Sequence, residues 1–114
     1  MTLLRIPAGS HVLIGRPAQP VSKTVIHAVH KLLLAFPSIA EAHLPQCFVR
    51  DKMERPAQVL VVVFEQDAES EQVLADLIVA MGTVLPAGVH LDVWPIDLGS
   101  ELLLHVRATG CQLF

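Results

Sequence analysis

Hydrophobic and polar positions along the chain follow two periods, and each change of period marks the boundary of an expected element. A short apolar run at residues 11–14, closed by Gly15, predicts a strand. From Val21 to Phe36 the apolar residues recur at helical spacing, which predicts a helix. Pro37 is expected to end this helix, because proline disfavours the helical conformation of the residue before it.

The middle of the chain predicts two extended segments. Residues 39–50 form the first, and Pro45 inside it removes a hydrogen-bond donor, which is typical of an edge or bulged strand. Residues 51–56 are a polar turn. Residues 58–65 then form the clearest strand of the sequence, since it is apolar on both of its alternating faces.

The last third predicts a helix, a strand and a short helix. Asp67 is expected to cap a helix that Pro86 and Gly88 stop. Residues 89–94 alternate as a strand does. Ser100 is expected to cap a terminal helix through residue 106, with Gly110 just beyond its end.

This order of elements predicts one α+β domain over residues 1–114. A β-α-β-β-α-β string is the split βαβ pattern of ferredoxin-like folds, an antiparallel sheet with two helices on one face. The first and third strands are then expected in the centre, and the second and fourth at the edges. The short C-terminal helix is an addition to this plan.

The third strand raises the question of what covers its second face, which is polar in a domain that stands alone. Here Val59, Val61 and Val63 on one face are apolar, as are the residues on the other face. A second copy of the chain is the favoured cover, since homodimers are the commonest oligomers. The alternative is that the terminal helix, with its leucines 102–104 and Val106, folds over this face.

Composition strengthens the expectation of a partner. The chain is 53% hydrophobic and 17% charged, against about 25% charged in ordinary globular domains, and 114 residues are too few to bury so much apolar surface. A net charge of −3 without a basic cluster argues against nucleic acid, and no apolar run is long enough to cross a membrane. The spacing of Cys47 and Cys111 forms neither a metal motif nor a disulfide framework, which favours a reducing cytoplasm.

The histidines and cysteines do not form a convincing catalytic or metal site. His27 and His30 share a helix face, but Lys23 and Lys31 lie four residues on either side of His27 and would repel a cation. We therefore expect a solvated helix face, with no metal and no cofactor.

His43 and Cys47 are an even number of residues apart, so they could share one face of the expected strand and form a nucleophile–base pair. Pro45, however, interrupts the register between them. Cys47 is expected to be a packing residue, and no catalytic residue is assigned.

Two further groups of residues are weighed as binding sites. His90, Asp92 and Trp94 line one face of the last strand, either as a site for a small polar ligand or as a partly solvated edge. Together with Val59, Val61 and Val63 they form the candidate interaction surface.

The segment after Gly15 is expected to be a structural connection rather than a phosphate loop. It has neither glycine-rich signature, and Pro17 and Pro20 lack the N–H donors that a phosphate needs.

The motifs together resemble the C-terminal domain of the bacterial SseB (enhanced serine sensitivity) family, from about Val12 to Phe114. The resemblance rests on the following residues: Gly15, Pro17, Pro20, Ile39, Ala42, Leu44, the strand 59–65 and Asp92. The chain departs from the family at His43, where an aromatic residue is common, and at the Leu113–Phe114 end, where an aromatic pair is expected. Members commonly carry a further N-terminal domain that this sequence does not include. The family implies no reaction and no cofactor.

The expected function is therefore a non-enzymatic, cytoplasmic protein-interaction or regulatory module that forms a homodimer through the open sheet face or the sheet edges. The alternative is a regulatory domain that senses a small molecule such as an amino acid. An enzyme that uses Cys47 or the histidines ranks last.

Overall fold

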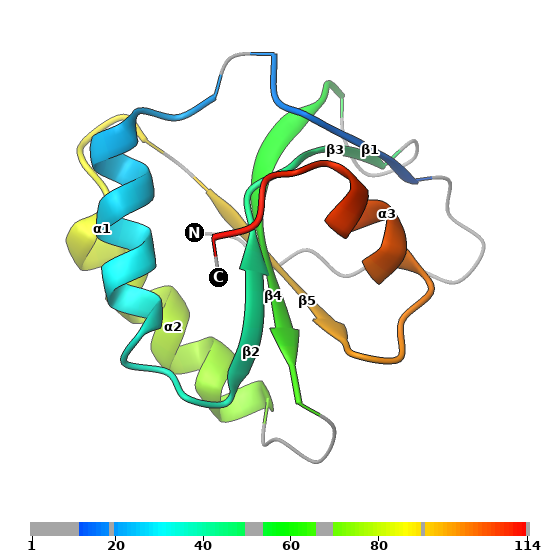
Figure 1. The fold of residues 1–114 in the computed structure, drawn as a ribbon. Coiled ribbons are helices and arrows are strands. Elements are labelled where there is room, and N and C mark those ends of the chain that lie inside the picture. Colours follow the sequence, from blue (N-terminus) through cyan, green and yellow to red (C-terminus); the bar gives the residue numbers. More distant parts are fainter. Residues whose placement is uncertain (1–11, 19, 50–53, 66–69, 90, 114) are drawn as a thin grey trace.

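The elements of the fold follow the expected order with one addition. The computed structural model describes residues 12–18, 20–49, 54–65, 70–89 and 91–113. Their helices and strands are β1 (Val12–Gly15), α1 (Lys23–Leu33), β2 (Ile39–His43), β3 (Gln46–Val49), β4 (Ala57–Phe64), α2 (Ser70–Val84), β5 (Asp92–Asp97) and α3 (Leu102–Ala108). The α+β class is confirmed (Figure 1). The cap expected at Asp67 lies outside the described residues.

The sheet is mainly antiparallel, and its strand order differs from the ferredoxin-like prediction. β4 is central, as expected, and pairs with β2, β3 and β5. β1, however, pairs with β3 rather than with β4 and lies at an end of the sheet. β5 runs parallel to β4 and takes the position next to it that the first strand was expected to hold.

The difference arises at Leu44 and Pro45, where the expected second strand divides in two. β2 pairs with the second half of β4. The first two residues of β3, Gln46 and Cys47, pair with the start of β4, and β3 also pairs along its length with β1. The carbonyl of Pro45 still accepts the Val59 N–H at 3.0 Å. The interruption expected from Pro45 is therefore confirmed, and it creates the separate β1–β3 ribbon that carries β1 away from β4.

β5 begins three residues later than the sequence pattern indicates. The strand was expected over residues 89–94, whereas β5 continues through Pro95, which pairs with Val62 of β4, and ends at Asp97. Among the described strands β5 pairs only with β4, so it is an edge strand, where proline is tolerated. The expected alternation of side chains is confirmed, because Leu91 and Val93 face one core and Trp94 faces the other.

The first core lies between the sheet and the helices α1 and α2, which pack side by side on one face (Figure 1). The Ser22 side chain accepts the Val25 N–H and caps α1, and α1 buries Val25, Val29 and Leu33. Opposite them lie Leu60, Val62 and Phe64 of β4. The prediction that both long helices cover the same face is confirmed. None of the described helices is long and apolar enough to cross a membrane.

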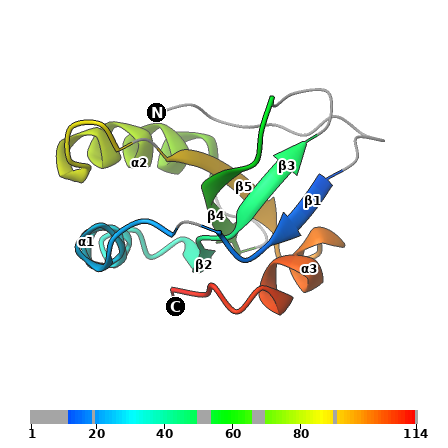
Figure 2. The same cartoon turned by 90° about the horizontal axis from the view of Figure 1, so that it is seen from above.

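The second core lies on the opposite face of β4, and α3 covers it (Figure 2). Val59, Val61 and Val63 are fully buried there, against Leu103 and Val106 of α3 and the other members of the cluster: Cys47, Trp94 and Ile96. The expectation that this face stays open for a partner is therefore wrong, and the alternative cover, the terminal helix, is the one found. The Ser100 hydroxyl accepts the Leu102 N–H at 3.3 Å, and Gly110 follows the helix with φ +70.

Two neighbouring leucines of α3 test this cover. Leu103 is 4% exposed in the second core, whereas Leu104 is 72% exposed. Leu103→Ala is expected to lower the free energy of unfolding by about 2–4 kcal/mol, because it leaves a cavity under the helix. Leu104→Ala, the same chemical change one residue later, should cost less than about 0.5 kcal/mol. Urea unfolding followed by the fluorescence of the buried Trp94 measures both values. Equal costs would show that α3 does not pack on the sheet.

Candidate interaction surface

An uncovered apolar surface exists, but it lies on the β1–β3 ribbon and not on β4. Leu13 of β1 and Phe48 of β3 are directly opposite each other in the register. Leu13 is 67% exposed and Phe48 is half-buried. Figure 2 shows the ribbon extending to the side of the sheet away from α1 and α2. We call Leu13, Phe48 and the adjacent Pro56 the β1–β3 patch.

A shallow pocket opens within the β1–β3 patch. It has a volume of about 270 Å³, and its lining is almost entirely apolar: Leu13, Ile14, Gly15, Gln46, Cys47, Phe48 and Pro56. Other strongly exposed apolar side chains, Leu34, Val79 and Leu104, lie on or at the ends of three different helices. Scattered apolar residues of that kind need no explanation on a protein surface, whereas adjoining apolar side chains around a pocket are a candidate interaction site.

Side chains alternate between the two faces of β1, and both faces carry apolar residues. Ile14 packs against the second core beneath α3, so its neighbour Leu13 must point to the opposite face of the ribbon. On that face α1 and α2 do not reach β1 (Figure 2). The exposure of Leu13 thus follows from the position of the ribbon beyond the two-helix layer.

β1 is also an edge strand of the described sheet. Among the described strands it pairs only with β3. Natural edge strands are commonly kept short or blunted by a charged residue, a proline or a bulge; β1 (Val-Leu-Ile-Gly) is short, at 4 residues, but contains no charged residue, proline or bulge. An edge of this kind is suited to pairing with another strand.

The candidate surface chosen from sequence does not come together. Val59, Val61, Val63 and Trp94 are buried in the second core, so a partner cannot reach them without displacing α3. Asp92 is half-buried at the start of β5. His90 lies outside the described residues. Sequence alone could not separate these valines from a free surface, because α3 and a second subunit satisfy the same apolar pattern.

The segment after Gly15 is a structural connection, as expected, and it is held by side chains from distant strands. The Gln46 side-chain oxygen accepts the Ala18 N–H at 3.2 Å, and the Gln58 side-chain oxygen accepts the Val21 N–H at 2.9 Å. Gln46 and Gln58 are themselves opposite each other on β3 and β4. These contacts keep the segment containing Pro17 and Pro20 against the sheet.

Arg16 has a structural role that the sequence did not indicate. Its Nε–H donates to the carbonyl of Thr109 at 3.0 Å, just after the last turn of α3. A cation is favourable near a helix C-terminus, where carbonyl groups lack partners. The next residue, Gly110, has φ +70, and a Cβ there would come within 3.1 Å of the Arg16 guanidinium.

A polar cluster of Glu41, His43 and Arg107 joins β2 to α3. His43 is fully buried, and its Nε2 is 3.0 Å from Glu41 Oε2. Arg107 donates from Nε to Glu41 Oε2 at 3.1 Å and from Nη2 to Oε1. The hydrogen bond from Arg107 is the main cause of a lowered pKa of Glu41. The parity of residues 41 and 43 could have indicated a shared face, but Arg107 lies too far along the chain for any local pattern to pair it with them.

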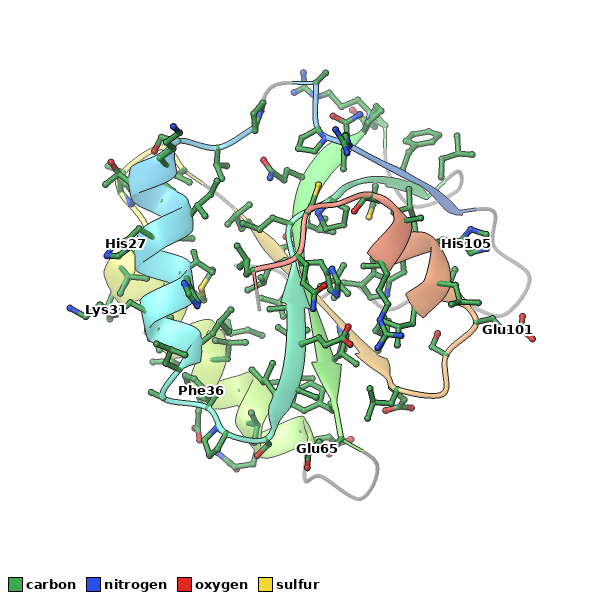
Figure 3. All side chains as sticks on the ribbon, in the orientation of Figure 1. His27, Lys31, Phe36, Glu65, Glu101 and His105 are labelled. Atoms are coloured by element: carbon green, nitrogen blue, oxygen red, sulfur yellow. The ribbon has the colours of Figure 1, made fainter. Side chains whose placement is uncertain are left out.

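The histidines and the cysteine that were considered for metal binding or catalysis do not form a reactive site. His27 and Lys31 project outward from α1 (Figure 3). His43 and Cys47 lie on different strands, and burial raises the pKa of the Cys47 thiol to about 12, which disfavours the nucleophilic thiolate. No group of three or more His, Cys, Asp or Glu side chains that could hold a metal occurs in the part of the chain that the structure describes.

The Glu41–Arg107 contact predicts a pH dependence of stability. A carboxyl group whose pKa is lowered on folding stabilises the folded state when the pH is above the ordinary pKa of the group, which is 4.5 for Glu41. This stabilisation is lost as the pH falls through the lower pKa of the folded state. Glu41→Gln should therefore be less stable than the wild type at pH 7, and the difference should shrink below about pH 5. Urea unfolding at several pH values measures it. Glu65→Gln, at an exposed position after β4, is the control. A constant difference across the pH range would contradict the assignment.

Comparison with known proteins identifies the family of the chain. Neither the curated proteins nor the solved structures include a match to it. A family model described as the SseB protein C-terminal domain matches residues 6–109, which is nearly the whole chain. The matched span includes all the described strands and helices, together with Gly15, Pro17 and Pro20. The chain belongs to the SseB C-terminal domain family.

Proposed function

We propose that this domain is a non-enzymatic protein-interaction module that forms a homodimer through the β1 edge and the β1–β3 patch. The observation that carries the proposal is the edge strand β1, which has no charged residue or proline, with Leu13 67% exposed beside an apolar pocket. It replaces the β4 face as the dimer surface, because α3 occupies that face.

Two copies of β1 can meet across a twofold axis. An isologous interface uses the same surface on both subunits, and antiparallel pairing of two identical edge strands satisfies that symmetry. Such pairing would join the two sheets and bring Leu13 of one copy to the β1–β3 patch of the other. The backbone hydrogen bonds then supply affinity, and the contact of Leu13 with the pocket of the other copy fixes the register.

The non-enzymatic part of the proposal is supported by the use of the polar side chains within the fold. Arg16 binds the end of α3, Gln46 and Gln58 hold the connection before α1, and Glu41 pairs with Arg107. The proposal includes a cytoplasmic location, supported by two free cysteines, and no role for nucleic acid, supported by a net charge of −3.

Small-molecule sensing is the second candidate, and the pocket in the β1–β3 patch is the observation in its favour. At about 270 Å³ the pocket lies just below the usual range of ligand sites, and Gln46 is the one polar side chain among the described residues that line it. An amino acid held there would place an apolar side chain in the pocket and its charged groups in solvent.

Homodimer formation is tested by charging Leu13. Light scattering on a sizing column, from about 1 to 100 μM protein, should show the wild type as a dimer that dissociates on dilution, since interfaces of small area are weak. Leu13→Asp should be a monomer throughout, because the pairing would bury an unpaired carboxylate.

Leu104→Asp is the matched control, since Leu104 on α3 is 72% exposed and lies outside the β1–β3 patch. It should dimerise as the wild type does. A monomeric wild type at every concentration, or a dimer that Leu13→Asp leaves intact, would reject the proposed interface.

The sensing alternative is tested by thermal unfolding with each of the twenty amino acids. A ligand present at a hundred times its dissociation constant adds about 2.7 kcal/mol of stability, which is a clear rise in melting temperature. Leucine, isoleucine or phenylalanine is the expected ligand, and Leu13→Asp should abolish the rise. No rise with any amino acid would exclude this alternative.

A further inference from the structure

The chain's own C-terminal residues form an extra strand segment on the outer edge of β2. The Leu44 N–H donates to the Cys111 carbonyl at 3.0 Å, and the Leu113 N–H donates to the Ala42 carbonyl at 2.7 Å. Between these two bonds His43 and Gln112 face each other in an antiparallel bridge. We call residues 111–113 the C-terminal strap.

The C-terminal strap closes an edge that would otherwise be open. The other edge of β2 pairs with β4, so the strap occupies the side on which β2 has no other partner among the described strands. Two of its contacts carry the argument: the backbone hydrogen bonds, which any extended segment can make, and the half-buried Leu113 side chain, which packs on the first core. These are the two elements by which an added strand is recognised.

The C-terminal strap is separable from the helix before it. The end of α3 is held by its own contacts, which are the Arg16 bond to the Thr109 carbonyl, the Thr109 hydroxyl bond to the Val106 carbonyl, and the Arg107–Glu41 pair. The chain then turns at Gly110, whose φ of +70 breaks the helical path. These three contacts do not involve the strap, which touches this end of α3 only weakly among the described contacts, through Cys111 Sγ at 3.6 Å from the Thr109 carbonyl oxygen.

We propose that the outer edge of β2 is a strand-acceptor site for an extended segment of a partner protein, and that the C-terminal strap occupies this site as an internal competitor. The partner segment has the pattern of the strap itself, with a large apolar side chain at the position of Leu113. The site is separate from the β1–β3 patch, and the proposal does not depend on the homodimer. Release of the strap exposes the edge, and the incoming segment restores the same backbone hydrogen bonds.

A displaced strap allows the site to be measured directly. In the full-length variant Leu113→Asp the strap carries a charge that the apolar core surface disfavours. The probe is a fluorescent peptide with the sequence of residues 109–114, carrying Cys111→Ser, and its binding is followed by fluorescence polarisation. It should bind the variant at least about tenfold more tightly than the wild type, whose tethered strap competes at a millimolar effective concentration.

The same peptide with Leu113→Asp is the control and should bind neither protein. Failure of the first peptide to bind the folded variant, or equal binding to variant and wild type, would overturn the proposal. A variant that does not fold would also overturn it, because the strap would then be an integral part of the domain.

Hydrogen exchange on the wild type gives a second, independent measurement. The amides of Leu44 and Leu113 should exchange at least about tenfold faster than those of central β4, because the strap opens without global unfolding. Equal protection of the strap and β4 would show that they open only together, and would reject a releasable strap.

Discussion

Burial of both faces of β4 is the constraint on which the rest of the structure depends. Residues 59–64 of this strand are apolar and almost wholly inaccessible to solvent. A strand of this kind needs a cover on each side. Helices α1 and α2 supply one cover, and α3 supplies the other. One short chain therefore builds two thin cores on a single strand, which explains how a sequence that is 53% hydrophobic folds within 114 residues.

Polar contacts with distant segments hold the end of α3 in place as a cover. The N-cap residue of α3 is Glu101 rather than the expected Ser100, whose hydroxyl accepts the Leu102 N–H, and at the end of the helix Arg16 donates to the Thr109 carbonyl. The ion pair of Arg107 with Glu41 adds a contact to β2. The polar side chains that looked available for chemistry in the sequence serve to hold this helix and the connection before α1. Arg16, Gln46, Gln58, Glu41 and Arg107 therefore have structural roles in the fold.

With both faces of β4 covered, the surfaces left for partners are at the margins of the sheet. The β1–β3 ribbon extends beyond the helices and exposes Leu13 beside an apolar pocket. On the opposite side of the sheet, the C-terminal strap is what closes the outer edge of β2 among the described residues. The chain belongs to the SseB C-terminal domain family. This membership assigns no reaction, so these two edges are where the function of the domain can be sought.

The sequence by itself determined the class of each element, the central position of β4, the two helices on one face and the interruption at Pro45. These follow from local periodicity and from the missing N–H of proline, which act within a few residues. Only the tertiary structure decided that β1 pairs with β3, that β5 runs parallel to β4, and that α3 rather than a second subunit covers Val59, Val61 and Val63. An apolar pattern states that a face must be buried but not by what, and contacts such as Arg107 with Glu41 depend on how distant segments meet in space.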